Sequence, residues 1–435
     1  MMRLARHDRS AIERSSRKLQ APGTLASRVA VVTMTLGAFV ACADSTVLGV
    51  EQGEPDGGAV VPPALDGGDA GLDAASDVTD AEVDADAAIP LCSTDGFCRT
   101  VVPKGARLIG VWGDGAGAVW ALSSGGDILR WDGSVWNIHR QTGLQGQSIW
   151  GSGPTDVWVA SGGKLFHGTG ASPASLVFAP VTDLPGDPNV PITSVWGTGP
   201  DDIWAVGMLE NWDDYPSVVT GRVLHFGPLA PSEQPDVGPI GGSGWTSDEE
   251  AASMGIGFRA VWGSPATGVW IDGLAFDEES GGLSIRVIRR PKSATEWTTI
   301  EGVQGYGFGL QGAALVSDSS VLVSGAIGSE EERYDVTWRG TSSDEGATFT
   351  WSYAIQPRWM RAFLAYWGTA ADDAWGVGEN GLVSHWDGMK WTQAVLRVTG
   401  SPVGRDIRAI WGSSNDDIWV VGDEIALHKT NAGKP

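Results

Sequence analysis

Val195-Trp196-Gly197-Thr198-Gly199-Pro200-Asp201-Asp202-Ile203-Trp204-Ala205-Val206-Gly207 is the stretch that decides the fold. It consists of two apolar runs joined by a Gly-Pro-Asp-Asp segment. Pro and Asp favour tight turns, because Pro presets φ and the Asp carboxylate accepts hydrogen bonds from nearby backbone amides. The stretch therefore predicts a β-hairpin whose two tryptophans lie eight residues apart.

The same hairpin recurs along the chain and is marked by tryptophan pairs with the same spacing. The six pairs are Trp112/Trp120, Trp150/Trp158, Trp196/Trp204, Trp262/Trp270, Trp367/Trp375 and Trp411/Trp419. A seventh copy, over residues 312–326, carries Ala314 and Leu322 in place of the tryptophans. Successive copies lie 38 to 66 residues apart, a variable period near that of four-stranded propeller blades.

Each complete unit contains four strand signals, which we name A to D in chain order. In the first unit they cover residues 108–113, 119–123, 128–132 and 135–140. Turns rich in Gly, Asp and Ser separate them, and no helical periodicity competes. The seven units predict an all-β fold over residues 92–435, a seven-bladed β-propeller of four-stranded antiparallel blades.

The last unit has signals for strands A, B and C only. Residues 97–102 lie just before the first A strand. In the other units, this position is taken by the D strand of the preceding unit. Aligned with Met389-Lys390-Trp391-Thr392, this segment places Arg99 in the tryptophan slot. We therefore expect residues 97–102 to complete the last blade and close the ring, which removes a free sheet edge.

The N-terminal residues 1–41 predict a lipoprotein signal peptide. Their first 28 residues carry seven Lys or Arg. The apolar run that follows is too short to span a bilayer but suits a signal-peptide core. It ends in Phe39-Val40-Ala41-Cys42, which resembles a bacterial lipobox. We expect lipidation of Cys42 and an exported protein held at the outer membrane or cell surface of a Gram-negative bacterium. An ordinary secretory signal is the alternative.

Residues 42–91 predict a tether between the lipidated cysteine and the propeller. Twelve acidic residues, no basic residue and no aromatic residue occur over 43–90. Such a composition cannot bury a core, so we expect disorder. A calcium-binding tract is the alternative, although the Asp spacing lacks the ordered Gly and Glu of a calcium loop. The net charge of −24 also argues against nucleic acid as a partner.

Cys92 and Cys98 remain once Cys42 is assigned to lipid, and an exported chain predicts that they pair in a disulfide. Two thiols without a nearby His do not suggest a metal site. We expect no metal and no cofactor.

Together, the repeat, the lipobox, the tether and the cysteine pair resemble predicted bacterial surface lipoproteins with VWG…DDVWAVG propeller repeats. These are related to the Asp-box (BNR) propellers. The resemblance covers about residues 92–435 and is specific to fold rather than activity. One Asp-box, Ser342-Ser343-Asp344-Glu345-Gly346-Ala347-Thr348-Phe349, lies between a C and a D strand signal. The resemblance implies that it is a folded turn rather than a catalytic site.

Most aromatic and histidine side chains occupy repeat positions. Twenty of the 22 tryptophans do so, which predicts packing between blades. Four histidines share one C-strand position, and a repeated hydrogen bond to a turn Asp is favoured over metal binding. They are His167, His225, His385 and His428.

The candidate ligand site lies where units depart from the repeat. Units three, four and five have long acidic B–C connections, which we predict to be loops over 209–220, 273–282 and 327–334. The B–C and D–A connections of a blade share one face. The two tryptophans outside the repeat and their neighbours lie in such connections, and the predicted site consists of Trp212, Asp213, Asp214, Tyr215 and Trp359. An exposed aromatic ring beside carboxylates suits a sugar or a cationic partner. Solvated insertions without function are the alternative.

These observations predict a lipid-anchored envelope protein whose propeller binds a glycan or protein ligand, with no catalysis. A glycoside hydrolase of the sialidase-like Asp-box type is one alternative. That chemistry needs an arginine triad and a Tyr nucleophile, and Phe258-Arg259-Ala260-Val261 does not match the Phe-Arg-Ile-Pro phrase of that class. An inert structural scaffold of the envelope is the other alternative.

Overall fold

The computed structural model describes residues 92–211, 218–228, 243–278, 281–305, 310–328, 332–356, 361–396, 398 and 402–430. The predicted signal peptide, Cys42 and the predicted tether up to residue 91 lie outside the described residues. Within these ranges, no helix has the length and apolar character needed to cross a membrane.

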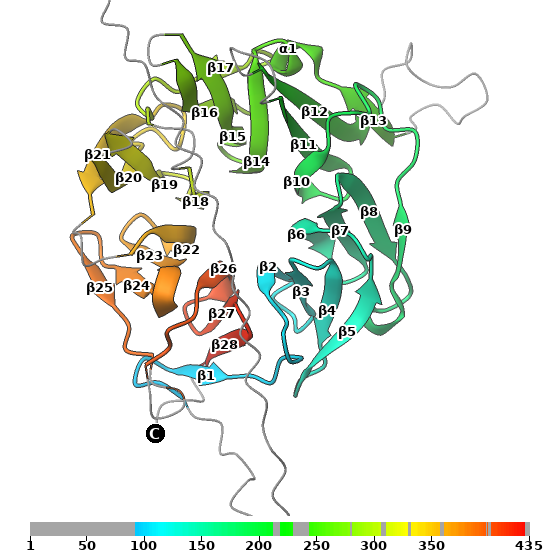
Figure 1. The fold of residues 1–435 in the computed structure, drawn as a ribbon, viewed down its shortest axis with the longest axis vertical. Helices are drawn as coiled ribbons and strands as arrows, with labels where there is room; N and C mark the ends of the chain where they lie inside the picture. Colours follow the sequence, from blue (N-terminus) through cyan, green and yellow to red (C-terminus); the bar gives the residue numbers. More distant parts are fainter. Residues whose placement is uncertain are drawn as a thin grey trace, which may run out of the picture. The chain divides into compact units, whose positions relative to one another are not determined.

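The described residues form seven four-stranded antiparallel sheets, which confirms the predicted seven-bladed β-propeller (Figure 1). The innermost strand of each blade contacts that of the next blade, and β26 of the last contacts β2 of the first, so the ring is closed. The strands alternate with short turns, as the sequence pattern predicts.

The blades are numbered in chain order. Blade one consists of β2 (Leu108–Gly113), β3 (Val119–Ser123), β4 (Asp127–Trp131) and β5 (Trp136–Gln141), and blade two of β6 (Gly146–Gly153), β7 (Asp156–Ser161), β8 (Lys164–Thr169) and β9 (Val177–Pro180). Blade three consists of β10 (Ile192–Gly199), β11 (Asp202–Asn211), β12 (Val218–Pro228) and β13 (Ser243–Ser247), and blade four of β14 (Ile256–Ser264), β15 (Gly268–Asp277), β16 (Gly282–Arg290) and β17 (Thr298–Thr299). Blade five consists of β18 (Gly312–Ser317), β19 (Ser320–Gly328), β20 (Arg333–Thr341) and β21 (Thr350–Ile355), and blade six of β22 (Phe363–Ala370), β23 (Asp373–Gly378), β24 (Val383–Trp386) and β25 (Trp391–Gln393). Blade seven consists of β26 (Ile407–Ser414), β27 (Asp417–Gly422), β28 (Ile425–Thr430) and β1 (Phe97–Arg99), and the short helices are η1 (Pro173–Ser175), α1 (Glu249–Ala252) and η3 (Glu379–Gly381).

The two tryptophans of each repeat lie directly opposite each other on strands A and B. This register holds for all six pairs, and Ala314 faces Leu322 in the same way in blade five. The eight-residue spacing therefore reports cross-strand pairing, and the seventh copy is confirmed.

The glycine that follows the first tryptophan of the repeat has a packing role. A Cβ atom at Gly151 would lie 2.7 Å from the ring of Trp112 in the preceding blade, and one at Gly113 would lie 2.6 Å from Trp411. Gly197, Gly263 and Gly412 have the same relation to the preceding blade. Only glycine allows this approach without displacing the ring, so the Trp-Gly pair of the sequence is the point where neighbouring blades meet.

Aromatic contacts between neighbouring blades continue around the ring. The B-strand tryptophan of one blade contacts an aromatic residue on the outer strand of the next blade, or an aromatic residue just before that strand. Measured between ring centroids, these pairs are Trp120–Phe178 (5.7 Å), Trp158–Trp245 (5.7 Å), Trp204–Trp297 (5.9 Å), Trp270–Trp351 (6.3 Å), Trp375–Phe97 (5.5 Å) and Trp419–Trp136 (5.3 Å). All six are edge-to-face contacts, a favourable geometry for aromatic rings. The tryptophans therefore pack between blades, as predicted.

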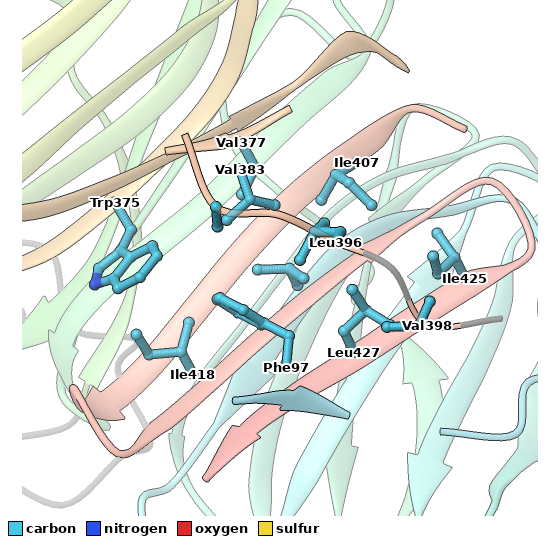
Figure 2. Close-up of a cluster of buried hydrophobic side chains, with 12 residues drawn as sticks. Phe97, Trp375, Val377, Val383, Leu396, Val398, Ile407, Ile418, Ile425 and Leu427 are labelled. Carbon is cyan, nitrogen blue, oxygen red and sulfur yellow. The ribbon is translucent and has the colours of Figure 1, made fainter. Parts of the chain in front are cut away.

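The N-terminal strand closes the ring, although the predicted range and alignment were not accurate. β1 pairs antiparallel with β28 and completes the last blade, but it ends at Arg99 rather than at residue 102. Phe97, not Arg99, takes the aromatic slot, because Cys98 faces His428 as Thr392 faces His385 in blade six. Figure 2 shows Phe97 among Trp375, Ile418 and Leu427.

The segment around β1 also contacts the blades on either side of the last one. The Thr100 amide donates to the carbonyl oxygen of Ala426, and Val101 forms a parallel bridge with Val135 of blade one. On the other side, the Val395 amide donates to the Asp95 carboxylate at 2.9 Å. The shorter strand is thus one part of a strap across blades six, seven and one.

A disulfide joins Cys92 and Cys98 at the start of this strap, as predicted. It closes a short hairpin in which the Gly96 amide donates to the carbonyl oxygen of Ser93. Reduction should therefore increase the conformational entropy of the unfolded chain and loosen the strap.

We expect reduction of this disulfide to lower the free energy of unfolding by about 2 kcal/mol, the magnitude for a short closed loop. Thermal unfolding with and without dithiothreitol measures the effect. A Cys92→Ser, Cys98→Ser double variant should match the reduced protein and show no response to reductant. Equal stability of the oxidised and reduced proteins would contradict this prediction.

Candidate functional site

The predicted ligand residues fall outside the described part of the chain. Trp212, Asp213, Asp214 and Tyr215 belong to the connection between β11 and β12, and Trp359 to the connection between β21 and β22. These are a B–C and a D–A connection, as the repeat predicts. The structure describes the strands that flank them.

The long B–C connections of blades three, four and five begin and end as β-ribbons, which corrects the prediction of loops over their full length. Strands B and C in these three blades have nine to eleven residues. The corresponding strands of the other blades have four to six. Over 209–220, for example, β11 continues to Asn211 and β12 begins at Val218. We call these three extensions the raised ribbons.

The raised ribbons of blades three and four are packed together. Val219, Leu274 and Leu283 are buried in one apolar cluster, with Met208 and Phe276 partly buried against it. Strand pairing continues from Val206 and Val223 out to Asn211 and Val218. Side-chain packing and a continuous ladder hold the ribbons in place, so they form a supported wall rather than loose insertions.

A groove of about 630 Å³ lies between blades four and five on this face. One wall is the end of the blade-four ribbon and the other is the end of β19. The connection 299–305, which leads from blade four to blade five, completes it. Its residues are Asp277, Leu283, Ser284, Arg286, Thr299, Ile300, Glu301, Val303, Gln304, Gly305, Ile327 and Gly328. This volume falls within the range typical of small-ligand sites, about 300–1,000 Å³.

The groove combines an apolar surface with a few polar groups. The Arg286 guanidinium lies 3.4 Å from the Asp277 carboxylate and donates to the carbonyl oxygen of Ile285 at 3.0 Å. Glu301 and Gln304 are exposed beside it. Hydroxyl, amide, carboxylate and guanidinium groups in one groove can hydrogen-bond a polar ligand in several directions. In the described ranges, no group of three or more His, Cys, Asp or Glu side chains could hold a metal ion.

Residues 342–349, quoted above as an Asp-box, form a hydrogen-bonded turn between β20 and β21. The Asp344 carboxylate accepts from the Thr348 hydroxyl at 2.6 Å and from the Thr348 amide at 2.9 Å. These bonds and one from Ser342 lower the pKa of Asp344 to about 2. The Arg289 guanidinium donates to the carbonyl oxygens of Gly346 and Ala347, which fixes the turn to blade four. The carboxylate thus serves the turn as a hydrogen-bond acceptor for three donors.

The four repeated histidines bond turn carboxylates, as predicted. Nε2 of each ring lies 2.5 to 2.8 Å from an Asp oxygen, in the pairs His167–Asp156, His225–Asp202, His385–Asp373 and His428–Asp417. Each imidazole also packs against the B-strand tryptophan of its blade, with centroids 3.7 to 4.6 Å apart. The Asp side chain further accepts from a Ser or Thr of strand A, as from Thr198 at 2.5 Å in blade three. These arrays fasten strands A, B and C together.

The three blades without this histidine carry arginine at the same position, a pattern that the sequence reasoning missed. Each arginine lies opposite the second tryptophan slot of its blade, as each histidine does. The pairs are Arg130–Trp120, Arg289–Trp270 and Arg339–Leu322. These blades lack the Asp two residues before the second tryptophan slot. Their guanidinium groups reach carbonyl oxygens instead, as Arg339 does at Ala371. Alignment on the second tryptophan would have revealed the substitution.

We expect acid to destabilise the protein through these arrays. Hydrogen bonding from His225 lowers the pKa of Asp202, and burial lowers the pKa of His428. Both groups therefore bind protons more readily in the unfolded chain, so stability falls as the pH decreases.

The free energy of unfolding should decrease below pH 6.5 through His428 and again below pH 3.8 through Asp202, their ordinary pKa values. Urea denaturation from about pH 3 to about pH 8 measures it. A His428→Gln variant should lose part of the change in the upper range. Stability that is constant or rises on acidification would contradict the assignment.

The comparisons with known proteins establish the fold class. Neither a family model nor a curated protein sequence matches the chain. Among solved structures, the one titled YCF48 bound to D1 peptide is 13% identical, with 79% of this chain and 100% of that chain covered and a TM-score of 0.52. YCF48 from Cyanidioschyzon merolae is also 13% identical, with 78% and 99% covered and a TM-score of 0.52. A catalytically inactive virginiamycin B lyase from Staphylococcus aureus with quinupristin is 12% identical, with 76% and 96% covered and a TM-score of 0.46. At such identities the likeness concerns the β-propeller fold alone.

Proposed function

We propose that this chain is a lipid-anchored cell-envelope protein whose propeller is a binding module. The ligand occupies the groove between blades four and five, beside the raised ribbons. The observation that carries the proposal is that the raised ribbons and the groove occur at the same place in the ring. Two of the three blades with raised ribbons, blades four and five, border this groove.

The groove suits a glycan or a protein segment. Its polar groups can pair with hydroxyls or peptide groups, and Leu283, Ile300 and Val303 supply apolar contact. One YCF48 propeller structure is bound to D1 peptide, so a ligand of this class is compatible with such a fold. Trp212, Tyr215 and Trp359, which belong to connections on the same face, are proposed as further contacts.

The binding proposal can be tested with the full chain on a glycan array and with candidate envelope proteins in purified form. We expect an Arg286→Glu variant to weaken binding by about tenfold or more, because it replaces the groove's donor with a carboxylate. Arg140→Glu, an exposed substitution on blade one, is the matched control. Trp212→Ala and Trp359→Ala should also weaken binding. Unchanged binding in all of these variants would contradict a ligand site on this face, and absence of binding by the wild-type protein would favour an inert scaffold.

The anchor is tested separately. We expect a Cys42→Ser variant to move from the membrane fraction to the soluble fraction, and the wild-type protein to carry lipid on Cys42 in intact-mass measurements. The proposal includes no catalysis. Turnover of a sugar substrate by the wild-type protein would revive the hydrolase alternative.

A further inference from the structure

We propose that a second pocket, on the opposite face of the ring, binds a small anionic ligand through Arg290 and Lys292. The pocket has a volume of about 430 Å³ and lies between blades three and four. It is lined by the A–B turn of blade three, the A–B turn of blade four and the C–D turn of blade four. Since these turns lie at the other ends of the strands from the B–C and D–A connections, this pocket is separate from the groove described above.

Trp204, His225 and Arg290 line the pocket and contact one another. The buried Trp204 ring has the His225 imidazole stacked on it, with centroids 4.1 Å apart. The Arg290 guanidinium also lies over Trp204, 4.4 Å from the ring centroid, and comes from the neighbouring blade. Trp204 also meets Trp297 of that blade edge to face, at 5.9 Å between ring centroids, as Trp158 and Trp419 meet aromatic rings of their next blades. A guanidinium held against this ring gives the pocket a cationic side.

The Asp202 carboxylate of the pocket wall already accepts three hydrogen bonds from protein donors. One Asp202 oxygen accepts from His225 at 2.8 Å and from the Trp204 indole at 3.1 Å. The other accepts from the Thr198 hydroxyl at 2.5 Å. Asp202 therefore has little capacity left to bind a cation, and its negative charge is offset by the surrounding dipoles.

The cationic groups retain donors. Arg290 has five N–H donors, and one of them bonds Asp248 at 3.0 Å. In the described part of the chain, no ion pair involves Lys292, which is exposed at the pocket edge. Asp201 and Glu296 belong to the same turns, but neither lines the pocket. A carboxylate or phosphate group is the ligand chemistry that matches spare donors of a guanidinium and an ammonium.

The site stands out because the chain as a whole carries a net charge of −24. An acidic protein repels anions over most of its surface. The pocket differs from the rest of this acidic surface, because Arg290 and Lys292 lie beside Asp202, whose carboxylate already accepts three hydrogen bonds. Its volume exceeds that of a single ion, which favours a small molecule with an anionic group.

Isothermal titration of the full chain with citrate and, separately, with inorganic phosphate tests this inference. We expect saturable binding of at least one probe, and affinity reduced about tenfold or more by Lys292→Gln, which removes a charged donor. Lys164→Gln, an exposed substitution on blade two, should leave binding unchanged. Far-ultraviolet circular dichroism checks that each variant is folded.

The two probes separate the sources of the anion. Binding of citrate alone indicates a carboxylate ligand, and binding of phosphate alone indicates a phosphorylated one. Absence of saturable binding of either probe would overturn the inference, as would equal affinities of the Lys292→Gln variant and the wild type.

Discussion

Replacement of Phe97 with alanine is expected to lower the free energy of unfolding by about 3–5 kcal/mol, the usual cost of deleting a buried aromatic ring. Phe97 is fully buried in the cluster that joins blades six and seven. Its ring meets Trp375 edge to face and continues the aromatic contacts that run around the propeller. The loss should be larger than that of a comparable residue within one blade, because Phe97 belongs to the strand that closes the ring.

Guanidinium denaturation of the full chain, followed by tryptophan fluorescence, measures the effect. Val101→Ala is the matched control, because Val101 belongs to the same strap and is 64% exposed. Phe97→Leu should lose less, since it retains part of the volume. If Phe97→Ala and Val101→Ala have the same small effect, the strap does not contribute to stability as proposed.

The fold could be predicted because the spacing of the repeated tryptophans reflects the pairing of neighbouring strands. Two tryptophans eight residues apart around a turn are direct cross-strand neighbours, and the structure places all six pairs in that register. The missing D strand of the last unit predicted closure by the N-terminal segment. These inferences need only strand periodicity and a count of units.

The details of closure were harder to predict. β1 has three residues, too few for an alternating pattern to fix its register. Alignment on a tryptophan slot then favoured Arg99, because five of the other units carry tryptophan there. Phe178 of blade two occupies that slot as well, so the slot requires an aromatic ring rather than tryptophan.

The candidate site could be predicted only in part. The face and the three unusual blades followed from connection lengths, but acidic residues and glycines made the raised ribbons resemble loops. Alternating apolar residues such as Leu274 and Phe276 were the available strand signal. The groove itself depends on how 299–305 passes the blade-four ribbon, and no sequence pattern specifies that arrangement.

Substitution of Asp272 with alanine is the second change with a large expected effect, about 3–5 kcal/mol of destabilisation. The side chain is fully buried, and its carboxylate pairs with the Arg259 guanidinium at 2.9 Å and accepts from the Trp262 indole at 3.0 Å. Burial raises the pKa of Asp272, while Arg259 opposes that shift. Arg259 also donates to the carbonyl oxygen of Gln311 in blade five, at 2.7 Å. Loss of the carboxylate leaves that cation, whose side chain is 30% exposed, without its ion-pair partner, and it leaves the buried Trp262 indole without its acceptor.

The exposed pair Arg333–Asp335 provides a matched control in the neighbouring blade. These two side chains are 49% and 34% exposed, and Asp335→Ala should cost about 0–1 kcal/mol. An Arg259→Met, Asp272→Leu double variant should lose less than the sum of its single variants, because no uncompensated charge remains buried. Chemical denaturation of the wild type, the two single variants and the double variant measures this coupling. Additive losses would show that the two side chains act independently, and that the charge pair does not join blades four and five.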